Sequence, residues 1–160
     1  MVTAAVAGAA MIVRAASPDD VPAIADLYEE LAHFYGVGVE PLADRLVQIR
    51  AALFGELPAG ALLLAWDGSE LAGAAAYSFL WPAVGMHRSL YLKELYIAAA
   101  HRRQGVGKLL MARLFEVAAE HECSRVEWTA DDVNVDAQRF YAELGVPVRT
   151  SKLFYRVSLS

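Results

Sequence analysis

The sequence has one cysteine, no long apolar run and no excess of positive charge, and each lack excludes a class of protein. Cys123 alone cannot form an internal disulfide, which fits a reducing cytoplasm. No stretch of about 20 apolar residues is present, so no membrane span is expected. The formal charge of −5 argues against a nucleic-acid partner, because a basic face supplies most of that affinity.

The remaining composition predicts one folded domain. A chain of 160 residues can bury about 70% of its unfolded surface in a single core. Residues 1–10, MVTAAVAGAA, lack the basic start of a signal peptide and are predicted to be a disordered leader or an overlong start. Residues 11–160 are predicted to form the domain.

Alternation, capping residues and turn signals predict the order of the secondary structure. Ser17 and Pro18 begin one helix, and Asp67-Gly68 marks a hairpin turn. The expected strands cover residues 11–15, 61–66, 71–80, 89–97, 125–130, 146–150 and 153–158, and the expected helices run from 17 to about 35, 41 to 53, 106 to about 118, and 135 to 144. This order predicts a mixed α/β sheet with helices on both faces.

The segment 101–110, HRRQGVGKLL, places cations and glycines where a helix begins. Arg102, Arg103 and Lys108 lie near the N-terminus of that helix, where the macrodipole disfavours them unless an anion is bound. Free backbone N–H groups and glycines that admit a ligand complete an anion site, most naturally for phosphate.

Two familiar phosphate loops do not fit this segment. A P-loop needs a glycine five positions before Gly107 and a hydroxyl residue after Lys108, but Arg102 and Leu109 occupy those places. A dinucleotide fingerprint starting at Gly105 would need its third glycine at Leu110.

The remaining pattern, Arg102-x-x-Gly105-x-Gly107, resembles the Gln/Arg-x-x-Gly-x-Gly/Ala signature of the GNAT superfamily of N-acetyltransferases. The strand SLYLKELYI at 89–97 and the segment NVDAQRFYAELG at 134–145 resemble the flanking motifs of that family. The resemblance covers nearly the whole chain from Ile12 and is greatest to the diamine acetyltransferases. It implies a mostly antiparallel sheet that splays at its central strands.

The resemblance also implies direct acyl transfer, without a metal, from acetyl-CoA to a primary amine of a small molecule that is either amino-acid-like or a polyamine. The backbone of Leu95, Tyr96 and Ile97 would align the pantetheine arm, and one N–H there would point at the thioester oxygen. The residues implied in pyrophosphate binding are Arg102, Arg103, Gln104, Gly105, Val106, Gly107 and Lys108. Asn134 is a helix cap on its spacing and, by the resemblance, also binds the CoA arm.

Tyr141 and Glu94 are the candidate catalytic residues. On periodicity alone Tyr141 belongs to a core stripe with Phe140, but its spacing from Asn134 matches the proton-donating tyrosine of the family. Glu94 is either a solvated strand residue or the base that deprotonates the amine. His33 and Tyr35, with Phe34, are either ordinary loop and core residues or substrate contacts, since the first two helices border the acceptor pocket in the family.

The acceptor prediction depends on one departure from the family pattern. Where the diamine enzymes have an acidic pair, this chain has Lys93-Glu94. Strand alternation would place Glu94 with Leu92 and Tyr96, and Lys93 on the opposite face, unless a bulge changes this. A lysine beside the acceptor would repel a polycation and favour an amine that also carries a carboxylate, such as a lysine-like or thia-lysine amino acid.

Two other functions are compatible with the same motifs. A catalytically silent CoA-binding sensor or scaffold would keep 102–107 without needing Tyr141, and a protein N-acetyltransferase would use the same chemistry. A homodimer is the habit of the family.

Overall fold

The computed structural model describes residues 2–6 and 9–159, and the chain divides into two compact units, residues 1–128 and 129–160. The strands are β1 (Val2–Val6), β2 (Ala9–Ala15), β3 (Ala61–Asp67), β4 (Glu70–Leu80), β5 (Arg88–Ile97) and β6 (Cys123–Glu127). The helices are α1 (Val21–Phe34), α2 (Leu42–Phe54), α3 (Val106–Glu120) and α4 (Val135–Glu143), and the short 3-10 turns are η1 (Pro18–Asp20), η2 (Val84–Met86) and η3 (Ala99–His101).

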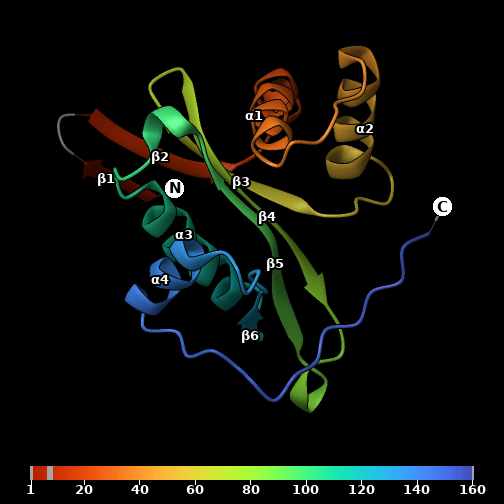
Figure 1. Cartoon of the computed structure of the whole chain (residues 1–160), viewed down its shortest axis with the longest axis vertical. Coiled ribbons are helices and arrows are strands. Elements are labelled where there is room, and N and C mark those ends of the chain that lie inside the picture. Colours follow the sequence, from red (N-terminus) through yellow and green to blue (C-terminus); the bar gives the residue numbers. More distant parts are fainter. Residues whose placement is uncertain (1, 7–8, 160) are drawn as a thin grey trace. The chain divides into compact units, whose positions relative to one another are not determined.

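The first unit is built on one sheet in the order β1-β2-β3-β4-β5-β6 (Figure 1). All neighbouring strands are antiparallel except β5 and β6, which are parallel because α3 connects them across one face. Helices α1 and α2 lie on one face and α3 on the other, as Figure 1 shows. The predicted mixed α/β sheet with helices on both faces is therefore confirmed.

Each face of the sheet has its own core. Towards α1, three helical side chains pack on strand residues; this cluster consists of Ile24, Leu27, Leu31, Leu62, Leu64, Ala74 and Tyr96. Towards α3, Leu110 and Leu114 are fully buried. A Cβ on Gly73 would lie 3.3 Å from Leu110 Cδ1 and 2.9 Å from Tyr96 O, so the small residue at this point lets α3 approach the sheet closely.

The beginning of the chain differs from the prediction. Instead of a disordered leader, Val2–Val6 form β1, whose ladder pairs Val2 with Val13 and Val6 with Ala9. The outer edge of β2 offers a row of backbone donors and acceptors, and valine and threonine fit a strand there. Residues 1, 7 and 8 of the predicted leader lie outside the described residues.

The end of the chain also differs. The predicted strands at 146–150 and 153–158 are not formed, and residues 146–159 have no regular structure. Val148 and Tyr155 are 82% and 84% exposed. An alternating sequence becomes a strand only when a neighbour pairs with its backbone; within the second unit, no described segment does so.

Candidate functional site

Helix α3 begins on a backbone that is open to an anion. Gly105, which precedes it, has φ +79°, and apart from its own atoms and those of its two chain neighbours, no heavy atom of the described residues lies within 4 Å of where its Cβ would be. The first α-helical bond of the turn joins the Leu109 N–H to Gly105 O at 3.2 Å. The N–H groups of Val106, Gly107 and Lys108 precede that bond, and no described side chain caps them.

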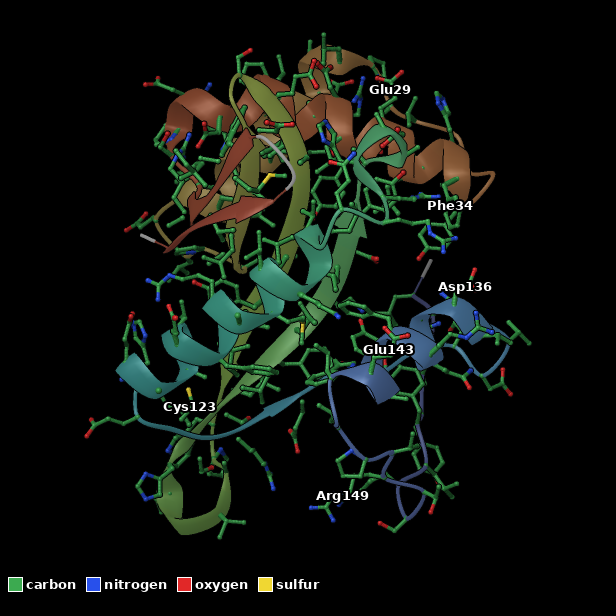
Figure 2. The ribbon with its side chains drawn as sticks, turned by 90° about the vertical axis from the view of Figure 1, so that its left-hand side faces the viewer. Glu29, Phe34, Cys123, Asp136, Glu143 and Arg149 are labelled. Carbon is green, nitrogen blue, oxygen red and sulfur yellow. The ribbon has the colours of Figure 1, made fainter. Side chains whose placement is uncertain are left out.

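The cations of the loop have different surroundings. Arg103 and Lys108 are exposed. Arg102 is also exposed, but its guanidinium lies 5.2 Å from the centre of the Phe34 ring and 5.7 Å from that of Tyr96, and its Nε donates to Ile97 O at 3.3 Å. Figure 2 shows Phe34 at the end of α1. Arg102 thus links the loop to α1 by cation–π contacts.

Glu30 of α1, which the sequence analysis did not single out, contacts the η3 turn that leads into this loop. Its Oε1 accepts the Ala99 N–H at 3.3 Å, while its Oε2 is buried without a hydrogen-bond partner among the described residues. Burial raises the pKa of the Tyr96 hydroxyl, and the nearby carboxylate of Glu30 raises it further. The only sequence signal was a carboxylate next to the apolar stripe of the first helix.

The last residues of β5 present a backbone edge away from β4. Strand β6 pairs with β5 only over residues 88–91, so the two strands separate beyond Tyr91. The Ala98 N–H donates to Ala72 O at 2.9 Å, which makes that pair a hydrogen-bonded one. Because such pairs alternate in an antiparallel ladder, the N–H groups of Leu95 and Ile97 point away from β4.

A β-bulge at Lys93 changes the faces predicted for β5. The register passes from Ala76 opposite Glu94 to Tyr77 opposite Leu92, which leaves Lys93 as the extra residue. Glu94 then shares the α1 face with Ala76, while Leu92 shares the α3 face with Tyr77. Simple alternation, which would place Glu94 and Lys93 on opposite faces, does not hold here, because the bulge that the prediction named as its exception is present and both residues lie on the α1 side.

A pocket of about 300 Å³ opens on that same side, between α1, α2 and the sheet. Its lining residues are Ile24, Tyr28, Ile49, Ala52, Leu53, Ala59, Gly60, Ala61, Leu62, Ala76, Tyr77, Ser78 and Lys93. Burial, and secondly the nearby charge of Glu94, raise the pKa of the Tyr28 hydroxyl. Lys93 therefore lines this pocket, and Glu94 lies near Tyr28, another of its lining residues.

The other predicted site residues lie elsewhere. His33 and Tyr35 are exposed at the end of α1, where Tyr35 contacts the Phe34 ring edge-on at 5.4 Å. Asn134 and Tyr141 belong to the second unit. Asn134 Oδ1 accepts the Ala137 N–H at 3.0 Å, which confirms it as the cap of α4, and the Tyr141 ring lies 5.2 Å from that of Phe140. Their roles in catalysis and CoA binding stay predictions.

The similarity to known proteins agrees with this geometry. Residues 24–146 match the acetyltransferase (GNAT) family. A thialysine N-epsilon-acetyltransferase from Sus scrofa is 29% identical over 149 residues, which cover 86% of this chain and 84% of the relative. Among solved structures, an integron cassette protein from the mobile metagenome of V. cholerae has a TM-score of 0.84 at 23% identity, covering 92% of both chains. An aminoglycoside N-acetyltransferase in complex with CoA has a TM-score of 0.77 at 19% identity, covering 95% of this chain and 97% of that one.

This chain belongs to the acetyltransferase (GNAT) family, because the family match spans well over half of it. It is an acetyl-CoA-dependent N-acetyltransferase. The open turn at Gly105 fits a pyrophosphate, and the outward N–H groups of Leu95 and Ile97 fit an extended amide chain. Among the residues that the structure describes, no three His, Cys, Asp or Glu side chains are grouped to hold a metal ion, and no helix is long and apolar enough to cross a membrane.

Proposed function

We propose that this protein acetylates the primary amine of a small molecule that also carries a carboxylate. The observation that carries the acetyl transfer is the adjacency of two features at the end of β5: the outward backbone edge of Leu95 and Ile97, and the uncapped start of α3 at Gly105. Together they offer donors for an amide chain and for a phosphate within one short stretch of chain. The carboxylate on the acceptor is proposed because Lys93 lines the pocket.

Acetyl-CoA, when bound, supplies the acetyl group as an activated thioester. The amides of residues 104–108 hold its pyrophosphate, and the N–H of Leu95 donates to the carbonyl oxygen. In the transfer, the amine nitrogen bonds to the carbonyl carbon, and the carbon–sulfur bond breaks. The ammonium form of the acceptor loses two protons in all, of which one is returned to the sulfur and one is released.

Glu94 and Tyr141 are the proposed proton carriers. Glu94 takes a proton from the acceptor ammonium, directly or through water, and Tyr141 donates a proton to the departing sulfur. An ammonium with a pKa near 10 loses its proton at pH 7 at a cost of about 4 kcal/mol, so a carboxylate placed on the pocket side of β5 assists the reaction. The carboxylate of the acceptor meets Lys93.

A homodimer and a cytoplasmic location complete the proposal. The homodimer comes from the family resemblance, and light scattering of the purified protein tests it. The location comes from the single cysteine.

Binding and turnover of acetyl-CoA test the central proposal. Calorimetry should show micromolar binding, and free thiol should appear only when an amine is added. Gly107→Glu should abolish binding, because the new carboxylate enters the phosphate space and repels the ligand. Ala112→Glu is the matched control, since it adds the same side chain to an exposed position of α3. Binding without thiol release on a broad amine panel would instead favour the silent CoA-binding module.

A further inference from the structure

The pocket between α1, α2 and the sheet has apolar walls. Buried Ile24 and Leu62 form part of it, together with Ile49 and Leu53 of α2. Among its lining residues in the described chain, none is acidic, and Lys93 is the only one that carries a charge. The Ser78 hydroxyl donates to Ala59 O at 3.0 Å, so this polar group is already paired.

Such walls disfavour a second ammonium group on the acceptor. A cation deep in the pocket loses its hydration, meets no carboxylate among the described lining residues, and lies near Lys93. The Glu94 carboxylate is on the same side of β5 and near Tyr28, but it is not part of that lining. An apolar group instead gains from leaving water. The volume of about 300 Å³ is at the lower end of the range for ligand pockets, which suits one amino-acid side chain better than a sugar-based antibiotic.

The β-bulge brings two charged residues, Lys93 and Glu94, to the same side of β5. Lys93 is exposed and Glu94 is half-buried, and both are on the pocket side of β5 as adjacent residues. One positive and one negative group so close in the chain match a ligand whose amine and carboxylate are also close together. An α-amino group and an α-carboxylate have this arrangement.

We infer that the acetyl acceptor is an α-amino acid with an apolar side chain, which occupies this pocket. Its amine faces Glu94 and its carboxylate faces Lys93. The inference rests on the proposed function, and it narrows the lysine-like acceptor expected from the sequence, because a lysine side chain would bring a second ammonium into the apolar pocket. The reaction is the same acetyl transfer, with the α-nitrogen as nucleophile.

The first experiment compares matched acceptors at saturating acetyl-CoA. Leucine, as both enantiomers, has the apolar side chain and the carboxylate; 3-methylbutylamine is leucine without the carboxylate; lysine and spermidine carry additional ammonium groups. For at least one enantiomer of leucine, kcat/KM should exceed that for each of the other three amines by tenfold or more. Calorimetric titration of the protein–CoA complex should show the same order of binding, independently of turnover.

Variants test the two contacts separately. Ala52→Phe fills the pocket from α2 and should lower kcat/KM for leucine tenfold or more, with acetyl-CoA binding retained. Ala51→Phe adds the same ring to an exposed neighbour outside the pocket lining and should change neither. Lys93→Glu should remove the preference for leucine over 3-methylbutylamine.

The outcomes separate this inference from the proposed function. Acetylation of lysine or spermidine as efficiently as leucine would overturn the inference and leave the N-acetyltransferase proposal standing. Equal losses in Ala52→Phe and Ala51→Phe would also overturn it. Failure to acetylate any amine of the panel, with acetyl-CoA bound, would overturn the proposed function and the inference together.

Discussion

Asp20 is a buried carboxylate that fixes the entry to α1. Its two oxygens accept from Arg14 Nη1 and Nη2 at 2.7 and 2.8 Å, and its Oδ2 also accepts the Ser17 N–H at 2.7 Å. The hydrogen bonds from Arg14 lower the pKa of Asp20 to about 2, although burial acts in the opposite direction. The folded chain therefore stabilises the ionised form of Asp20 more than the protonated form.

This difference predicts how stability depends on pH. The pKa of Asp20 in the folded chain is below its ordinary value of 3.8. Its contribution to the free energy of unfolding is therefore fully present above about pH 4 and is lost as the pH falls towards 2. Asp20→Asn should lower the free energy of unfolding at pH 7 by about 2 kcal/mol. Urea unfolding of the unmodified protein and of Asp20→Asn at pH 7, 4 and 2.5 measures this free-energy difference. The difference between the two proteins should shrink at the lowest pH; a difference that stays constant would mean that Asp20 acts by packing alone.

At the same scale, sequence patterns pointed to some of the candidate site residues and not to others. Gly105 was predicted because a helix start with glycines and cations has a local physical meaning, and α3 does begin directly after it. Glu30 and Tyr28 were not found as site residues, since their importance comes from contacts with β5 and the following loop, which are distant in the chain. Arg102 was predicted as a site residue, but its contact with Phe34 could not be read from the sequence of the loop.

At the scale of the elements, one prediction concerns a single backbone donor of β5, the N–H of Leu95. Leu95→Pro removes the N–H that points away from β4, and it leaves the ladder bonds of Glu94 and Tyr96 to β4 in place. Turnover should fall about 100- to 1,000-fold, as expected when a donor to the reacting carbonyl is lost. Steady-state kinetics measures the loss, and circular dichroism checks that the sheet remains.

Leu95→Ala separates the donor from the side chain, because it keeps the N–H and shortens the side chain. It should lose less than tenfold in turnover. Equal losses in the two variants would show that packing of Leu95, rather than its N–H, matters for the reaction.

Local signals determined which elements were predicted correctly. The Asp67-Gly68 turn and the proline at the start of α2 set their boundaries through short-range geometry, and both appear in the structure. The bulge at Lys93 is a matter of register between β4 and β5, so the sequence of β5 alone could not reveal it. The strands expected at 146–150 and 153–158 failed for the same reason, since alternation shows which residues could share a face but does not supply a pairing partner.

For the whole molecule, the proposed chemistry draws on both units of the chain. The loop before α3, the outer edge of β5 and the pocket belong to residues 1–128, whereas Asn134 and Tyr141 belong to residues 129–160. Only the family resemblance assigns Tyr141 a part in the reaction; its ring contact with Phe140 is equally compatible with a structural role. Its function must therefore be decided by kinetics.

Tyr141→Phe removes the hydroxyl and keeps the ring. A thiol titrates near 8.5 and a phenol near 10, so full proton transfer is uphill by about 2 kcal/mol, which a hydrogen bond that strengthens as charge develops on sulfur can offset. The turnover number should fall roughly 10- to 1,000-fold, with the affinity for acetyl-CoA by calorimetry nearly unchanged. Tyr155→Phe is the control, because it removes a hydroxyl from an exposed ring of the same unit and should leave turnover unaltered. If Tyr141→Phe turns over as fast as the unmodified protein, the hydroxyl is structural and water protonates the sulfur.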